Sequence, residues 1–214
     1  MAYSQNSEEE IILKYFDGLN KGVTPPDYIY SGRGPSFIDI GANDGMTLSN
    51  TRRLAELGWT GVLVEPSPTA FSRLQENYSR MKGFYLYPFA LGETNGVTTL
   101  YESGELLKKG DVALVSTIDE NEKGRWTPAN IKFNPVEVKV FRWKTFLNRL
   151  KIKKFDFISL DAEGLDLPIL RQIDLTDTKC ICVEWNGKNK DEFIKLCEGF
   201  RLIGENPENL IFAR

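Results

Sequence analysis

The sequence predicts an α/β fold with a central, mainly parallel seven-stranded sheet, helices on both faces and an antiparallel edge strand. Three observations lead to this prediction. From Ser36 onward, short apolar runs alternate with helical patterns, which is typical of strand–helix–strand units joined by right-handed crossovers. The 214 residues, of which 41% are hydrophobic and 27% charged, suit a single domain over 1–214. The last apolar run follows a short turn at Asn206-Pro207, which favours antiparallel pairing.

The N-terminal segment, 1–30, is predicted to be helical. Ser7 and Glu10 make a capping-box pattern, and apolar residues from Ile11 to Leu19 recur at helical spacing. Strands are then expected at 36–40, 61–65, 84–88, 136–141, 155–160, 179–185 and 208–213, and helices at 46–57, 68–80, 143–150, 164–172 and 189–198. Gly58, Gly83 and Gly199 stand where helix ends or turns are expected.

The segment from Phe37 to Gly45 carries the strongest functional signal. Its apolar start predicts a buried strand, and the stretch from Gly41 to Gly45 predicts a tight turn into a helix. Free backbone N–H groups at such a helix start favour carboxylate or phosphate groups, and glycine allows a ligand to approach the backbone closely. A second apolar run ends in Glu65, about 20 residues further on, where an acidic residue is positioned to bind ribose hydroxyls.

Two cofactor classes use this arrangement. A dinucleotide requires G-x-G-x-x-G for its pyrophosphate, whereas the glycines here are spaced Gly41-x-x-x-Gly45, with Asp39 and Asp44 beside them. Carboxylates repel a pyrophosphate but attract the sulfonium and ammonium groups of S-adenosylmethionine. The residues therefore favour S-adenosylmethionine over NAD, and an ordinary strand-to-helix turn is the alternative without a cofactor.

A third segment, from Phe155 to Leu170, contains Asp161-Ala162-Glu163-Gly164 after another apolar run. Together with Asp39-Ile40-Gly41-Ala42-Asn43-Asp44-Gly45 and Glu65-Pro66-Ser67-Pro68, it resembles the FkbM family of S-adenosylmethionine-dependent methyltransferases. The resemblance implies a Rossmann-like class I methyltransferase fold. Phe89-Ala90-Leu91-Gly92 stands where that family has an Asn-Ala-Leu stretch, and Phe89 departs from the polar residue common there.

The motifs and the resemblance predict a cofactor site and two catalytic carboxylates. The predicted cofactor-binding residues are Asp39, Gly41, Ala42, Asn43, Asp44, Gly45, Glu65, Pro66, Ser67, Ala90, Leu91 and Asp161. The chain contains no His, so a general base must be a carboxylate, Lys, Tyr, Cys or a metal-bound water. Asp161 and Glu163 are the predicted catalytic residues, although Asp161 could instead cap a helix beginning at Gly164.

A bound metal offers a second catalytic route. Asp161 ends one strand, and Glu184 and Asn186 end the next. Three oxygen ligands there could hold Mg²⁺ and lower the pKa of an acceptor hydroxyl. Because this spacing is not diagnostic, the prediction is that no metal is bound, and that Glu184 and Asn186 make substrate or turn hydrogen bonds.

The connection from 103 to 135 is long for a loop and is predicted to be either a substrate lid or a solvated insertion. A lid would bring Arg125 and Trp126 over the pocket. The predicted reaction is O-methylation of a hydroxyl on a saccharide or another small metabolite. The glycine spacing and the absence of Tyr-x-x-x-Lys disfavour an NAD(P)-dependent oxidoreductase, and the intact motifs disfavour an inactive binding protein with this fold.

Charge and hydropathy predict neither a nucleic-acid nor a membrane partner. The net charge is −3 and the basic residues are scattered. No apolar run approaches the ~18 residues of a membrane span, and the N-terminus lacks a signal-peptide core, so a cytoplasmic location is expected. The oligomeric state and the identity of the acceptor do not follow from the sequence.

Overall fold

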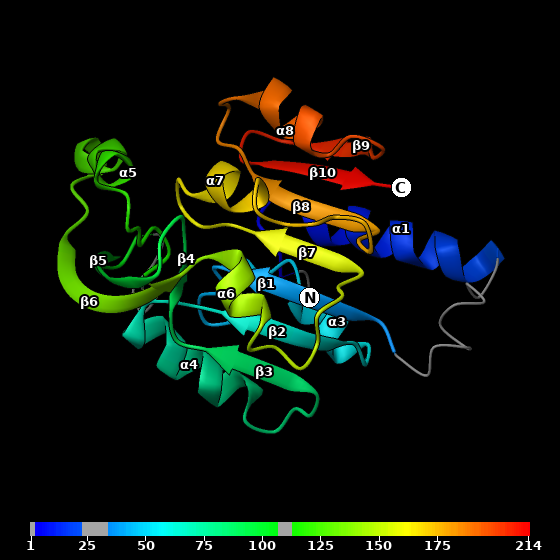
Figure 1. Ribbon diagram of the computed structural model, residues 1–214, viewed down its shortest axis with the longest axis horizontal. Helices are drawn as coiled ribbons and strands as arrows, with labels where there is room; N and C mark the ends of the chain where they lie inside the picture. Colours follow the sequence, from blue (N-terminus) through cyan, green and yellow to red (C-terminus); the bar gives the residue numbers. More distant parts are fainter. Residues whose placement is uncertain (1–2, 23–33, 107–112) are drawn as a thin grey trace.

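The computed structural model describes residues 3–22, 34–106 and 113–214. Its centre is a seven-stranded sheet in the order β3-β2-β1-β7-β8-β10-β9 (Figure 1). The strands are β1 (Ser36–Ile40), β2 (Thr60–Val64), β3 (Phe84–Tyr87), β7 (Phe157–Leu160), β8 (Cys180–Glu184), β9 (Arg201–Glu205) and β10 (Asn209–Ala213). All neighbouring pairs are parallel except those that β10 forms with β8 and β9. The predicted α/β, mainly parallel fold is confirmed.

Two of the predicted strand positions were wrong. Residues 136–141 do not enter the central sheet: they belong to β6 (Phe133–Phe141), which pairs with β5 (Gly96–Ser103) and β4 (Ala90–Leu91) in a second sheet. Their alternating burial is typical of a strand with one solvated face, whereas parallel strands are buried on both. The final run, β10, is antiparallel but not at the edge, because β9 lies outside it.

Sequence analysis did not predict the edge strand β9, because this segment has little apolar character. Its five residues are exposed or half-buried, and Gly204 interrupts the pattern. All five residues of β10 are buried, which fits an interior strand with a neighbour on each side. The apolar content of the two segments therefore distinguishes the edge strand, β9, from the interior strand, β10.

Helices cover both faces of the central sheet, as predicted. They are α1 (Glu8–Gly22), α3 (Arg52–Glu56), α4 (Pro68–Tyr78), α6 (Trp143–Leu147), α7 (Asp166–Leu170) and α8 (Lys190–Leu196). Side chains of α1, α3 and α4 pack with Phe37, Cys180 and Cys182 on one face. Side chains of α6, α7 and α8 pack with Ile38, Ile40 and Ile181 on the other. Alternate residues of β1 and β8 thus supply two separate cores.

The helix predicted to begin at residue 46 begins only at Arg52. The Asp44 carboxylate accepts hydrogen bonds from the Met46 and Thr47 backbone N–H groups, at 2.8 and 2.6 Å, and Leu48 has a positive φ of 56°. The local bonds of Asp44 therefore compete with the helix and hold this stretch as a loop. The other predicted helices are shortened by one to three residues at their ends.

The second sheet lies at the carboxyl ends of the parallel strands (Figure 1). Between β5 and β6 the chain forms α5 (Glu120–Arg125) and η1 (Thr127–Ala129). This is the segment predicted as an insertion at 103–135, of which 107–112 fall outside the described residues. None of the helices in the described ranges is long and apolar enough to cross a bilayer.

Gly41 is the point where β1 and β7 meet most closely. It has φ +82°, and a Cβ at this position would lie 1.7 Å from the Asp161 carbonyl oxygen. Gly58 has a similar φ of +90° but no heavy atom within 4 Å of the same position. Both glycines have a positive φ that is costly for other residues, but only Gly41 also has backbone atoms where a side chain would lie. Comparing substitutions at the two positions therefore distinguishes the steric clash from the cost of the positive φ.

We expect Gly41→Ala to lower the free energy of unfolding by about 3 kcal/mol or more, since it combines left-handed strain with steric overlap. Gly58→Ala, which meets only the strain, should lose about 1–2 kcal/mol. Urea denaturation of both variants measures the difference. Equal losses would show that the contact with Asp161 imposes no constraint.

Candidate active site

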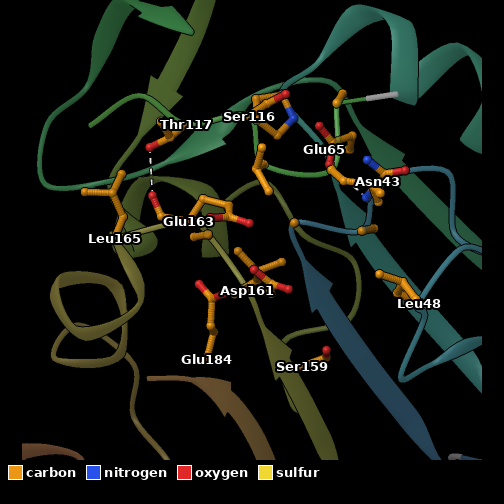
Figure 2. Close-up of a pocket in the computed structure, with 18 of the residues that line it drawn as sticks. Asn43, Leu48, Glu65, Ser116, Thr117, Ser159, Asp161, Glu163, Leu165 and Glu184 are labelled. Carbon is orange, nitrogen blue, oxygen red and sulfur yellow. Dashed lines mark hydrogen bonds between the residues drawn. The ribbon is translucent and has the colours of Figure 1, made fainter. Parts of the chain in front are cut away.

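A pocket opens at the carboxyl ends of β1, β2, β7 and β8, and residues 113–118 from the β5–β6 connection line its opposite side (Figure 2). Of the predicted site residues, those that line it are Asp39, Gly41, Ala42, Asn43, Glu65, Pro66, Ala90, Leu91, Asp161, Glu163, Glu184 and Asn186. Motifs more than 100 residues apart in the sequence therefore surround one cavity.

Three predicted cofactor residues, Asp44, Gly45 and Ser67, are not among the lining residues. Asp44 holds its own loop through its bonds to Met46 and Thr47. A Cβ on Gly45 would lie 2.5 and 2.6 Å from side-chain atoms of Tyr78 and Leu74, so this glycine allows the loop to pack on α4. Ser67 is the N-cap of α4. The structure gives all three a role in shaping the loops around the pocket.

Glu65 ties together the two loops at the ends of β1 and β2. Its Oε2 accepts a hydrogen bond from the Asn43 backbone N–H at 2.8 Å, and its Oε1 accepts one from the Ser67 N–H at 2.7 Å. Desolvation raises its pKa to about 7 in spite of these two bonds. Each carboxylate oxygen retains a second lone pair, so Glu65 can hold the loops and still accept a bond from a ligand.

Asp39 is buried at the end of β1, below the first loop. Its Oδ2 accepts a hydrogen bond of 2.6 Å from the Thr51 hydroxyl, which anchors the far end of the loop to the strand. Desolvation raises the pKa of Asp39 to about 6, and the hydrogen bonds from Thr51 and Ser159 limit the rise. The fold therefore favours the neutral form of Asp39 more than water does.

The turn after β7 presents Asp161 and Glu163 to the pocket. Glu163 and Gly164 both have positive φ, 44° and 97°. Asp166 closes the turn by accepting bonds from the Ala162 and Gly164 backbone N–H groups, at 2.7 and 3.2 Å. The capping role considered for Asp161 is not observed, because α7 begins at Asp166 rather than at 164, its N-cap residue is Leu165 and that residue makes no side-chain capping bond. Asp161 is exposed toward the pocket (Figure 2).

Glu163 connects this turn to the β5–β6 connection. Its carboxylate pairs with Arg125 at 3.3 Å, and its backbone carbonyl accepts a 2.7 Å hydrogen bond from the Thr117 hydroxyl (Figure 2). Desolvation and the nearby Asp161 raise the pKa of Glu163 well above its usual range, while Arg125 lowers it. Arg125 and Trp126 line the pocket.

The pocket is strongly acidic. Glu8, Asp39, Glu65, Asp161, Glu163, Glu184 and Glu208 line it, and Arg125 is the only Lys or Arg among its described lining residues. The pKa of Asp161 and that of Glu184 are both raised well above the usual range, first by desolvation and then by neighbouring carboxylates. These charges repel one another, so a cation in the pocket would stabilise their ionised forms.

Several pocket residues were missed by sequence analysis. Gln5 and Glu8 precede or begin α1, and Glu208 and Asn209 lie at the start of β10. Glu8 accepts a hydrogen bond from the Asn209 amide at 2.9 Å, so that this wall joins the two ends of the chain. Thr117 belongs to the β5–β6 connection. Sequence analysis gave none of these residues a role in the site, because only the tertiary fold brings them to the pocket.

The comparisons with known proteins agree with this geometry. Residues 39–203 match the methyltransferase FkbM domain, which is well over half of the chain. The chain belongs to the FkbM methyltransferase family. The matched region begins at Asp39 and includes the first loop, Glu65 and the Asp161 turn, the motifs on which the resemblance was recognised. No protein of curated function matches the sequence significantly.

Solved structures show the same fold at low sequence identity. The methyltransferase FkbM from Methylobacillus flagellatus KT is similar with a TM-score of 0.52 and 12% identity, covering 85% of this chain and 44% of that one. Monomeric WbdD is similar with a TM-score of 0.50 and 14% identity, covering 99% of this chain and 42% of that one. The chain thus spans less than half the length of either protein.

Asp39→Asn tests the electrostatics of the site in the protein without ligands. A folded-state pKa raised to about 6 means that the native state binds this proton more tightly than the unfolded state. The contribution of Asp39 to stability is therefore greatest below about pH 4 and declines as the pH rises through 6. Asn has no charge to desolvate and can still accept the bond from Thr51.

We expect the stability of Asp39→Asn relative to the wild type to increase by on the order of 2–3 kcal/mol between pH 4 and pH 7. Urea denaturation at several pH values provides the measurement. Glu137→Gln, at an exposed position of β6, serves as the control and should show no such trend. If the difference in stability between Asp39→Asn and the wild type did not change with pH, Asp39 would not be desolvated as described.

Proposed function

We propose that this chain is an S-adenosylmethionine-dependent O-methyltransferase that acts on a hydroxyl of a saccharide or another small metabolite in the cytoplasm. The observation that carries the proposal is the acidic pocket at the carboxyl ends of β1, β2, β7 and β8. Ligands of open α/β sheets bind at this edge. The excess of carboxylates favours a ligand with positive charge and disfavours the pyrophosphate of a dinucleotide.

The cofactor end of the pocket is formed by the loops after β1 and β2. The donor set fits S-adenosylmethionine: Asp39 and Asp161 face the region where an ammonium and a sulfonium need compensation, and Glu65 can accept bonds from ribose hydroxyls. Ala90 and Leu91 line the same cavity and offer apolar contact for an adenine ring. When bound, this cofactor supplies an activated methyl group.

The acceptor end lies beneath the β5–β6 connection. The indole N–H of Trp126 is buried without a hydrogen-bond partner among the described residues, and Trp126 lines the pocket beside Glu163. An aromatic ring, an unpaired N–H donor and several carboxylates suit a ligand rich in hydroxyl groups. This combination supports a saccharide-like acceptor.

Deprotonation of the acceptor falls to a carboxylate, because no His is present. Glu163 and Asp161 are the two candidates, and their raised pKa makes each a stronger base than an ordinary carboxylate. Glu163 is held by Arg125, which directs its carboxylate along the pocket wall. Positioning of the acceptor and its desolvation on binding then provide much of the rate enhancement.

We expect S-adenosylhomocysteine to raise the melting temperature, whereas NADH should not. A ligand at 100 times its dissociation constant stabilises the native state by about 2.7 kcal/mol, which a thermal shift detects readily. Equal stabilisation by NADH would favour the oxidoreductase alternative. Stabilisation by neither ligand would favour a binding protein that has lost the cofactor site.

Glu163→Gln should reduce methyl transfer by about 100-fold or more, as expected for the loss of a general base. The measurement is the formation of S-adenosylhomocysteine with a panel of mono- and oligosaccharides. Glu122→Gln is the matched control, because Glu122 also pairs with Arg125 but does not line the pocket. If both variants lose activity equally, the effect comes from a displaced Arg125 and not from the loss of proton transfer by Glu163.

A further inference from the structure

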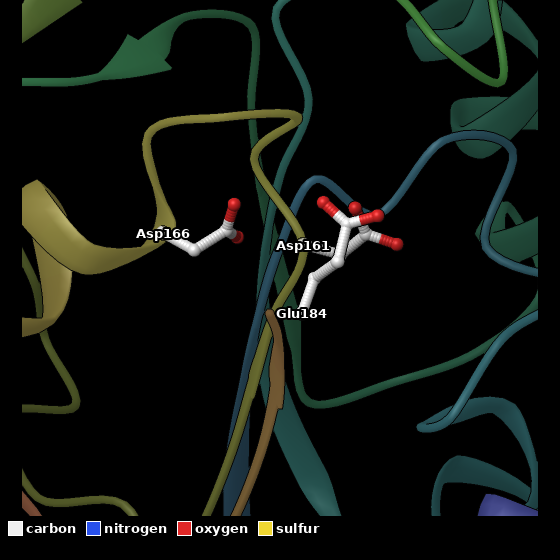
Figure 3. A group of neighbouring side chains, drawn as sticks. All are labelled: Asp161, Asp166 and Glu184. Atoms are coloured by element: carbon white, nitrogen blue, oxygen red, sulfur yellow. The ribbon is translucent and has the colours of Figure 1, made fainter. Parts of the chain in front are cut away.

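Three carboxylates converge on one point at the edge of the pocket (Figure 3). Asp161 comes from the end of β7, Asp166 from the start of α7 and Glu184 from the end of β8. One oxygen of each lies within 4.8 Å of the others. Sequence analysis paired Asp161 with Glu184 but gave Asp166 no role as a ligand.

Glu184 is distinguished by an oxygen that lacks a partner. It is 7% exposed, and its Oε2 has no hydrogen-bond partner among the described residues. Figure 3 shows its carboxylate beside that of Asp161. Asp156, which is also buried at 2% exposure, pairs with Lys179 and accepts a bond from the Ser36 N–H. A buried carboxylate oxygen without a donor is costly, so the contrast with Asp156 points to a ligand at Glu184.

No basic side chain compensates the cluster. None of the three carboxylates forms an ion pair with Lys or Arg in the described part of the chain. Around Glu184 the charged neighbours are all acidic, and only the Asn186 amide favours its ionised form. Two basic groups of the described chain pair with other carboxylates: Arg125 pairs with Glu163, and Lys188 lies 3.7 Å from Glu122.

We propose that Asp161, Asp166 and Glu184 bind a hard divalent cation such as Mg²⁺ or Mn²⁺. Carboxylate oxygens are preferred ligands of these ions. Two oxygens bound to the same ion at roughly 2.0–2.6 Å lie at most about 4–5 Å apart, and the three carboxylate oxygens are all within 4.8 Å of one another. The backbone N–H groups of Ala162 and Gly164 hold Asp166 in place while leaving its remaining lone pairs free.

A cation bound at this site would change which carboxylates act in the proposed reaction. With Asp161 engaged by the metal, Glu163, which pairs with Arg125, is the remaining candidate base. An ion at this edge faces the pocket, so that an acceptor hydroxyl could complete its coordination and lose its proton more readily. The site itself rests on the three carboxylates and not on the proposed methyl transfer.

The test is a titration of the full chain with Mn²⁺, in which electron paramagnetic resonance measures free Mn²⁺ with and without S-adenosylhomocysteine. We expect one saturable Mn²⁺ per chain that Mg²⁺ displaces. Glu184→Gln should weaken its binding by at least ~10-fold. Glu208→Gln removes the same charge from another wall of the pocket and should weaken Mn²⁺ binding by less than ~3-fold, by loss of distant charge alone.

Each outcome bears on the proposal. Absence of saturable binding, or binding unaffected by Glu184→Gln, would overturn it. Displacement of Mn²⁺ by saturating S-adenosylhomocysteine would also overturn it, because the carboxylates would then serve the ammonium group of the cofactor. If Glu184→Gln does not fold, Asp161→Asn replaces it with the same expectation. Mn²⁺ binding without any binding of S-adenosylhomocysteine would leave the metal site standing and contradict only the proposed function.

Discussion

The close contact between Gly41 and the backbone of Asp161 is the constraint on which the site depends. The Asp161 backbone N–H donates to the Ile40 carbonyl oxygen at 2.9 Å, and the absence of a Cβ on Gly41 lets the first loop pass directly over the end of β7. A side chain there would force the two strand ends apart. Asp39, Glu65 and Asp161 share one pocket because nothing separates the loops that carry them.

The acidity of the pocket is a consequence of that convergence. The ends of β1, β2, β7 and β8 each contribute a carboxylate, and parallel strands place these ends along a single edge. Burial and mutual repulsion then raise the pKa of these groups, which disfavours their ionised forms in the empty protein. Bringing these carboxylates together lowers the free energy of unfolding, which is common at functional sites. A cation removes this cost, whether it belongs to a cofactor or is a metal ion.

The second sheet supplies the wall that the central fold lacks. Strands β4, β5 and β6 stand beyond the carboxyl ends of the parallel strands, and the connection between β5 and β6 returns to contact the turn after β7 (Figure 1). The hydrogen bond from Thr117 to the Glu163 carbonyl and the ion pair between Arg125 and Glu163 fasten this wall to the turn after β7. Glu102 of β5 also accepts hydrogen bonds from the Thr69 backbone N–H and hydroxyl, so the second sheet contacts the start of α4 as well.

The sequence by itself determined the fold class, both faces of the central sheet and the motifs at the ends of β1, β2 and β7. These features depend on periodicity, glycine and the sign of charge, all of which are local in the chain. Only the tertiary structure decided that residues 136–141 leave the central sheet, that β9 is its edge and that Asp44, Gly45 and Ser67 support the loops beside the pocket. It alone brought Asp166 to Glu184 and the N-terminal Glu8 to Asn209. Such pairings depend on which strands become neighbours, and local composition does not encode that choice.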